Sequence, residues 1–198
     1  MVGHRFNPDK MKQIENFKTL FLLFIGFIAN PNTVKYPSIN IHQKLINVVF
    51  YYLPISFLIG VILLWYPVAI AEKLGIFNPL IDSSGERAIF TTILSAIVIA
   101  PLIEEGIFRL SLGYYRDEKY FGILYYASSV LFGLVHIFTY KFDSTHHLYI
   151  PFITMTQIFS GFMFGYIRMV YGFWYGVLLH SVYNIFGVIW LYFIGFSI

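Results

Sequence analysis

Long stretches without a charged residue most constrain what this chain can fold into. Asp, Glu, Lys and Arg are absent from residues 45–71, 120–140, 148–167 and 169–198. About 20 apolar residues in a helix span the roughly 30 Å hydrocarbon layer of a bilayer. Only 12% of the residues are charged and 58% are hydrophobic, whereas a soluble domain carries about 25% charged residues. The alternation of a transmembrane barrel strand is missing, so we predict an all-α, polytopic membrane helical bundle.

The predicted bundle has about five full crossings and a short N-terminal helix, in a single membrane domain without repeats. Residues 1–18 form a polar, basic head. Residues 19–29 are apolar but reach under about 20 Å as a helix, so we expect them to be interfacial or partly inserted. Full crossings are expected near residues 45–71, 86–112, 120–140, 148–170 and 173–197. Residues 1–87 thus hold the head, the short helix and the first crossing, and residues 88–198 hold a helical core.

Prolines and glycines are expected to shape these helices. Four prolines should mark kinks or helix starts, because proline lacks the N–H that a helix interior uses: Pro54, Pro67, Pro101 and Pro151. Two glycine pairs have a four-residue spacing that lets membrane helices approach closely: Gly161 with Gly165, and Gly172 with Gly176.

The distribution of Lys and Arg predicts a multi-pass cell-membrane protein with a cytoplasmic N-terminus. If residues 19–29 do not cross, one side of the membrane collects nine basic residues and the other side three. If they do cross, the counts are seven and five, which hardly discriminate. The net charge of +3 suits an anionic lipid surface better than nucleic acid. The oligomeric state is not indicated.

Ionisable side chains inside the predicted crossings are few, and in lipid such residues usually face a bundle interior or a wet cavity. They are Glu104, Glu105, Arg109, His136 and His180, joined by the amide of Asn184. Because they come from three separate predicted helices, we favour a functional site over a set of unrelated structural residues.

The two glutamates are expected to differ. Glu105 and Arg109 stand four apart, share a helix face and can pair. Glu104 points about a quarter-turn away and has no basic neighbour of its own, so it suits a general base beside a charged partner. The alternative is a buried Glu105–Arg109 pair that only fixes helix packing, with Glu104 lining a crevice.

The other polar residues leave more than one interpretation open. His180 and Asn184, four apart on one helix face, can bind a metal, orient a water, donate to an oxyanion or hydrogen-bond two helices together. His136 is either part of the site or a structural hydrogen-bond donor. We expect His146 and His147, in a loop with Asp143, to be solvated, with adventitious metal binding as the alternative.

Missing residues exclude several chemistries. The chain has no Cys and therefore no thiol nucleophile. It has neither a His-Glu-x-x-His zinc helix nor a Gly-x-Ser-x-Gly elbow. No Asp lies in the predicted crossings, which excludes an intramembrane aspartate dyad.

The order of the polar residues resembles the CPBP intramembrane protease family. Three motifs carry the resemblance: Glu-Glu-x-x-x-Arg at residues 104–109, Phe-x-x-x-His at 132–136 and His-x-x-x-Asn at 180–184. This family includes the type II CAAX prenyl endopeptidases and bacteriocin-processing, Abi-like proteins. The resemblance covers about residues 88–190. Leu110 departs from it, because a glycine commonly follows the arginine.

The resemblance implies a membrane-embedded endopeptidase. Glu104 would activate the hydrolytic water with help from His136, and the Glu105–Arg109 pair would keep the site in shape. His180 and Asn184 would stabilise the oxyanion.

A cofactor and the activity itself are less constrained. One divalent metal, zinc held by Glu104, His136 and His180, is chemically plausible, but the His-x-x-x-Asn pair favours a metal-free mechanism. Two alternatives to a peptidase are a non-proteolytic membrane regulatory or immunity protein of the same family, and a small transporter with a Glu/His proton relay. The substrate is open among a prenylated C-terminus, a pheromone precursor, a bacteriocin leader and a membrane protein.

Overall fold

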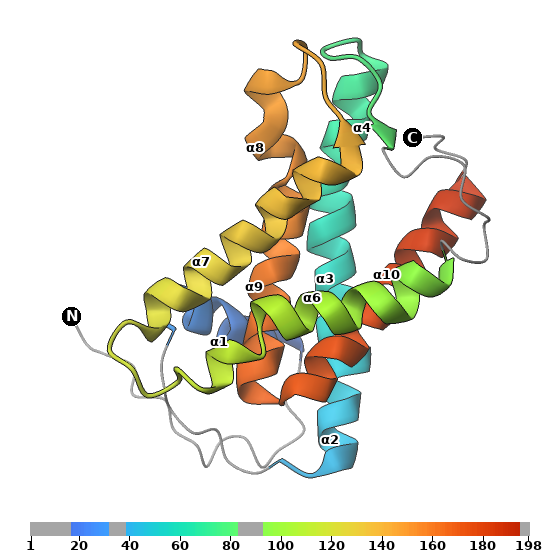
Figure 1. Ribbon diagram of the computed structural model, residues 1–198. Coiled ribbons are helices and arrows are strands. Elements are labelled where there is room, and N and C mark those ends of the chain that lie inside the picture. Colours follow the sequence, from blue (N-terminus) through green and yellow to red (C-terminus); the bar gives the residue numbers. More distant parts are fainter. Residues whose placement is uncertain (1–16, 32–38, 83–92, 195–198) are drawn as a thin grey trace.

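The chain folds almost entirely into helices (Figure 1). The computed structural model describes residues 17–31, 39–82 and 93–194. Its α-helices are α1 (Phe17–Ala29), α2 (Ile41–Ile46), α3 (Leu53–Phe57), α4 (Tyr66–Lys73), α6 (Ala100–Phe108), α7 (Phe121–Val135), α8 (Ile150–Ile153), α9 (Met155–Val170) and α10 (Phe173–Ile194). Extended structure in these residues is a pair of two-residue strands, β1 (Ile81–Asp82) and β2 (Tyr140–Lys141). The predicted all-α class is confirmed.

Three helical stretches are long and apolar enough to cross a membrane: Ile41–Lys73, Phe121–Thr139 and His147–Val170. They match three of the predicted crossings to within a few residues at each end. The helix predicted at 173–197 is present as α10, which is described as far as Ile194. The helix predicted at 86–112 is described only from residue 93, and α6 ends at Phe108.

Proline explains where the α-helices widen into π-helices. The π-helical segments are η2 (Asn47–Tyr52), η3 (Leu58–Trp65) and η4 (Ser95–Ile99). They lead directly into α3, α4 and α6, whose first turns contain Pro54, Pro67 and Pro101. Proline cannot donate to the preceding turn and clashes with its carbonyl, and a wider turn relieves that clash. Pro151 likewise stands in the first turn of α8, so each of the four prolines begins an α-helical segment, although Pro54 and Pro67 lie inside the continuous helical stretch Ile41–Lys73.

Helix α9 lies at the centre of the bundle, with α1, α7, α10 and η3 packed around it. Glycines allow α7 and α9 to touch. A Cβ on Gly161 would lie 2.7 Å from the backbone oxygen of Ser129, and one on Gly133 would lie 2.7 Å from the backbone nitrogen of Ile158. A Cβ on Gly165 would lie 2.9 Å from the ring of Tyr125. The close helix approach predicted for Gly161 and Gly165 is therefore confirmed.

The two glycines of the second pair have different surroundings. Gly172 has a φ angle of +115° and lies between α9 and α10, where it allows a turn that other residues rarely adopt. A Cβ on Gly176 would lie 3.3 Å from Oε2 of Glu105 and 3.7 Å from the backbone oxygen of Phe164 in α9. Gly176 thus stands at a close helix contact, as predicted, whereas Gly172 serves the turn.

Helix α1 belongs to the core of the bundle. Leu20, Phe24 and Phe27 are at most 2% exposed, and the two phenylalanine rings pack edge-on against Tyr166 of α9. Residues such as Leu22 on the other face are exposed. With 13 residues, α1 is about 20 Å long, which is shorter than the hydrocarbon layer.

A small cap covers one end of the bundle, at the top of Figure 1, and consists of residues 76–82 and 140–149. The strands β1 and β2 pair there in antiparallel fashion. Beneath them a second hydrophobic cluster joins Phe77 and Leu80 to Val68 of α4 and Ile153 of α8. The cap therefore connects the end of the helical stretch Ile41–Lys73 to α8, which leads into α9.

The prediction that His146 is solvated is wrong, because two loops close over it. His146 is 1% exposed. Its Nε2 donates to the carbonyl of Asn78 at 2.8 Å, and its Nδ1 accepts from the backbone N–H of Asp143 at 3.0 Å. Its neighbour His147 is exposed, as expected.

Candidate active site

Helix α6 carries both glutamates and ends at the arginine. Glu105 and Arg109 are fully buried, and Nη1 of Arg109 lies 3.4 Å from Oε1 of Glu105. The guanidinium carbon lies 3.8 Å from the ring centroid of Phe132 on α7, within range of a cation–π attraction. The pair predicted from the four-residue spacing is thus formed, and an aromatic ring supports it.

A second arginine holds the end of α6. Arg168 on α9 donates from Nε to the carbonyl of Arg109 at 3.3 Å and from Nη2 to that of Leu110 at 3.4 Å. Carbonyls at a helix end need such donors because no further turn supplies them. The last turn of α6, with Glu104 and Glu105, is therefore fixed against α9.

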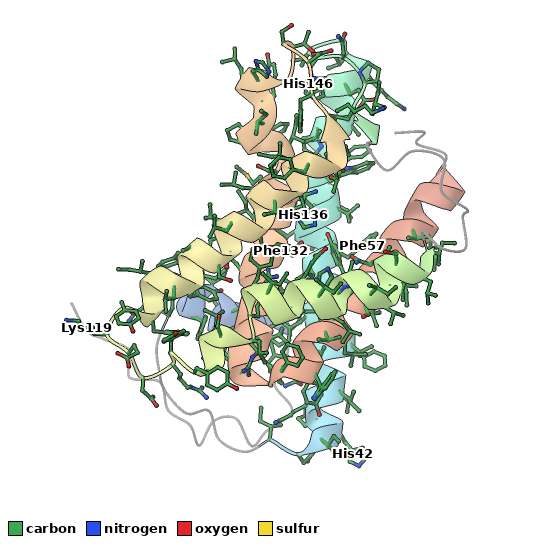
Figure 2. The ribbon with its side chains drawn as sticks, viewed as in Figure 1. His42, Phe57, Lys119, Phe132, His136 and His146 are labelled. Carbon is green, nitrogen blue, oxygen red and sulfur yellow. The ribbon has the colours of Figure 1, made fainter. Side chains whose placement is uncertain are left out.

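Three helices meet at the carboxylate of Glu104. Its side chain is 27% exposed, and its Oε2 lies 3.9 Å from Nε2 of His136 and 3.7 Å from Nε2 of His180. Within the described part of the chain, this buried oxygen has no hydrogen-bond partner. Figure 2 shows His136 and Phe132 midway between His42 at one end of the molecule and His146 at the other. The residues therefore converge deep in the bundle, far from both ends.

The hydrogen bond of His136 fixes where its proton lies. Nδ1 is 2.7 Å from the carbonyl oxygen of Phe132, and a carbonyl only accepts, so Nδ1 carries the proton. In the neutral ring, Nε2 is then an acceptor, and it faces the carboxylate of Glu104. Two acceptors cannot bond to each other directly, but one water can donate a hydrogen to each.

His180 is oriented by Glu105. Its ring stacks on Phe164 with centroids 4.4 Å apart, and its Nδ1 lies 3.1 Å from Oε1 of Glu105. Because a carboxylate paired with Arg109 accepts and does not donate, Nδ1 carries a proton. Nε2 of His180 is then a donor only when the ring is an imidazolium. Oxyanion donation by this residue thus requires the doubly protonated ring.

The side-chain amide of Asn184 makes a structural hydrogen bond with one of its two N–H groups. Its Nδ2 donates to the carbonyl of Ala96 in η4 at 2.8 Å. In η4 the N–H of Ala100 bonds to Ser95, five residues back, and the next such bond would run from residue 101 to Ala96. Pro101 has no N–H to make it, so Asn184 supplies the donor. One of its two amide hydrogens thereby joins α10 to η4, and the second is not needed for that bond.

A cavity of about 150 Å³ opens beside the histidines, which is room for more than one water. Two aromatic rings and a set of polar side chains line it: Phe132, Phe164, His136, Thr156, Gln157, Ser160, His180, Tyr183 and Asn184. The structure thus gathers Glu104, Glu105, Arg109, His136 and His180 into one set of contacts, with Asn184 in the adjoining wall.

A family model described as type II CAAX prenyl endopeptidase Rce1-like matches residues 86–186. This span is just over half of the 198 residues and contains every site residue predicted from the sequence. The chain belongs to the Rce1-like family. No curated protein and no solved structure matches it. The resemblance drawn from the three motifs is confirmed, because this family lies within the one they indicated.

The residues suggested for zinc in this Rce1-like chain do not form a metal site as they are placed. Within the described residues, no group of three or more His, Cys, Asp or Glu side chains is arranged to hold a metal ion. The two Nε2 atoms approach the same oxygen of Glu104 at 3.7 and 3.9 Å. The remaining nitrogen of each imidazole is engaged by Glu105 or by a carbonyl.

Two aromatic residues of the Rce1-like site had no assigned role in the sequence. Phe132 contacts the guanidinium of Arg109 and the rings of His136 and His180, and Phe164 stacks on His180. Phe132 stands four residues before His136, a spacing that places both on one face, so it could have been found. Phe164 has no such signal, because its partner lies on another helix.

Proposed function

We propose that this protein is an intramembrane endopeptidase that hydrolyses a peptide bond in a membrane-associated peptide or protein. The observation that carries the proposal is the convergence of two imidazole nitrogens, 3.9 and 3.7 Å away, on an oxygen of Glu104 that accepts no hydrogen bond from the described residues, beside a cavity. A carboxylate oxygen that is open to a hydrogen bond, next to room for water and substrate, suits proton abstraction.

The reaction follows from the positions of the protons. Water donates one hydrogen bond to Oε2 of Glu104 and one to Nε2 of His136, and its oxygen attacks the peptide carbonyl carbon as Glu104 takes the proton. The carbonyl oxygen becomes an oxyanion, which accepts from Nε2–H of the imidazolium of His180 and from Asn184. Glu104 then gives its proton to the amide nitrogen as the C–N bond breaks, leaving a carboxylate and a free amine.

Glu105 and Arg109 act through His180. Arg109 pairs with Glu105, and Glu105 accepts from Nδ1 of His180 and so orients its imidazole. The family name favours a prenylated C-terminal segment as substrate, and we propose that class first. A peptide precursor or another membrane protein is distinguished from it by the experiment.

The experiment compares cells that produce the wild-type protein or Glu104→Gln. New N-termini and C-termini in membrane peptides are mapped by mass spectrometry, and a peptide with a prenylated cysteine followed by three residues is tested on purified protein. We expect products that depend on Glu104. Glu118→Gln, an exposed glutamate, is the control. Equal products from all three proteins would favour the non-proteolytic alternative.

We propose the topology predicted from the charges, with five crossings, residues 88–198 as the catalytic core and a cytoplasmic N-terminus in the cell membrane. The chain has no Cys, so single cysteines can be labelled without background. Lys119→Cys should be protected from an impermeant maleimide added to intact cells, and Lys141→Cys should react. The reverse pattern would invert the topology.

A further inference from the structure

Helix α9 contributes one wall of the cavity, and this wall contains polar side chains that have no role in the proposed reaction. Thr156, Gln157 and Ser160 face the same cavity as His136 and His180. A peptide group that enters a site with little water needs partners for both its N–H and its C=O, because leaving them unbonded is costly. The side chains that supply those partners decide where the substrate backbone lies.

Most of these polar groups are already committed to other helices. The hydroxyl of Thr156 donates to the carbonyl of Gly60 in η3 at 3.3 Å. Ser160 is hydrogen-bonded to Tyr183 of α10, and the Tyr183 hydroxyl fits against Gly60, where a Cβ would lie 2.5 Å away. These bonds join α9 to η3 and α10, so a substrate would have to break them before using these groups.

Gln157 is the exception in this wall. With its amide oriented so that the nitrogen faces acceptors, Nε2 lies 3.3 Å from the carbonyls of Ile153 and Thr154, within its own helix. Both bonds are long, and at Thr154 Gln157 adds only a second bond, because that carbonyl already accepts from the backbone of Ile158 at 3.0 Å. Releasing that bond would leave the Thr154 carbonyl satisfied.

The segment around Gln157 also packs against the part of α7 that leads to His136. Ile158, the neighbour of Gln157, is the residue that touches Gly133 where α7 and α9 meet, and Gly133 is one turn before His136. A glutamine amide offers a donor and an acceptor side by side, which matches the two groups of a peptide bond.

We propose that Gln157 binds a backbone peptide group of the substrate and so sets which peptide bond lies against Glu104 and His136. The proposal rests on the proposed endopeptidase function. It assigns Gln157 to substrate binding and register, not to the chemical step.

The test uses full-length protein in lipid nanodiscs and a peptide whose cleavage disappears in Glu104→Gln. In Gln157→Met, which keeps the length of the side chain but removes both polar groups, we expect KM to rise about tenfold and kcat to stay within about threefold, the loss of roughly one hydrogen bond. Products cut one or more residues away from the wild-type position should appear. Thermal stability should not change.

Thr156→Val is the matched control, because Thr156 lines the same cavity but is bonded to Gly60. It should lower the melting temperature and leave the cleavage position unchanged. Binding of the same peptide to Glu104→Gln, with and without Gln157→Met, measures affinity without turnover and should differ about tenfold.

Each outcome separates the two proposals. Cleavage that depends on Glu104 but keeps its KM and its position in Gln157→Met overturns the role of Gln157 alone. A fall in kcat and melting temperature without a change in KM assigns Gln157 to structure. If no product depends on Glu104, the proposed function is overturned and the role of Gln157 with it.

Discussion

The protein contains two histidine–carboxylate clusters of similar composition and opposite character. In the cap, Nδ1 of His146 accepts from the backbone N–H of Asp143 and Nε2 donates to the carbonyl of Asn78, so both ring nitrogens have partners. In the site, two imidazoles stop 3.7 and 3.9 Å from an oxygen of Glu104 that has no hydrogen-bond partner in the described residues. The first cluster is saturated and the second is not.

The difference shows which feature of such a cluster points to chemistry. The hydrogen bonds of the two cap residues are local or join two loops: Asp143 accepts from Thr145 and Asn78, and His146 bonds back to Asn78. Such a network stabilises a loop but leaves no group to receive a proton. The proposed site leaves Oε2 of Glu104 without a hydrogen bond from the described residues, while Oε1 of Glu105 beside it is engaged by Arg109 and His180. Residue type alone would not have separated the two clusters.

The most direct test of this difference replaces one histidine of each cluster with glutamine. His136→Gln should lower kcat by roughly 10²–10⁴-fold, because its Nε2 no longer accepts a hydrogen from the water. His146→Gln should change kcat less than about twofold but lower the free energy of unfolding by roughly 1–3 kcal/mol, because it removes buried bonds between two loops. Kinetic and thermal-unfolding measurements on both variants test this expectation. Equal effects of the two substitutions on kcat would show that the two clusters do not differ in catalytic role.

The buried pair of α6 provides the largest expected effect on stability. Arg109→Ala leaves Glu105 without its cation and should lower the free energy of unfolding by roughly 3–5 kcal/mol, together with activity. Lys119→Ala, at an exposed position, is the control and should be neutral. Thermal unfolding in detergent measures both. A stable but inactive Arg109→Ala would show that Arg109 contacts the substrate instead.

Much of the site could be predicted because its main contacts are local in sequence. Glu105 and Arg109 are one helical turn apart, and so are Phe132 and His136. Three of the long helices follow from the uncharged stretches, since their limits agree with the structure to within a few residues. Periodicity and charge carry this information without any knowledge of tertiary structure.

What could not be predicted depends on contacts between distant segments. Nothing in the sequence indicates that His180 meets Glu105, 75 residues away. The bond from Asn184 to Ala96 depends on a backbone carbonyl, which carries no sequence signal except the proline five residues later. His146 was misjudged for the same reason, because its partners are a distant carbonyl and a loop N–H. Loop residues between helices are not necessarily solvated.

Asn184 has a structural bond and a proposed catalytic one, and the two can be separated. Asn184→Ala should lower kcat by roughly 10²-fold with little change in KM, since oxyanion donors act in the transition state. It should also lower the free energy of unfolding by about 1–3 kcal/mol, because the Ala96 carbonyl loses its donor.

In the Pro101→Ala background, residue 101 regains an N–H that can serve this carbonyl. The stability loss caused by Asn184→Ala should therefore shrink there, while the kcat loss persists. Parallel recovery of both quantities would assign Asn184 to helix packing alone. His180→Ala and Asn184→Ala should combine less than additively if both serve one oxyanion.

The smallest expected effect concerns the cap in acid. Hydrogen bonds from the Thr145 hydroxyl and then the Asn78 amide hold the pKa of Asp143 below its usual range. A lowered pKa means that the ionised form stabilises the fold above the ordinary aspartate pKa of about 3.9, and that this contribution is lost as the pH falls through the folded value. Between pH 5 and 8 the ionisation of Asp143 should thus leave stability unchanged, since the carboxylate is charged throughout.

Asp143→Asn should lower the melting temperature slightly in that range and reduce its decline below about pH 4. Because the side chain is 47% exposed, the shift should be smaller than that of His146→Gln. Melting curves from pH 3 to 8 measure it, and a change in kcat with Asp143→Asn would contradict the separation of the saturated cluster from the site.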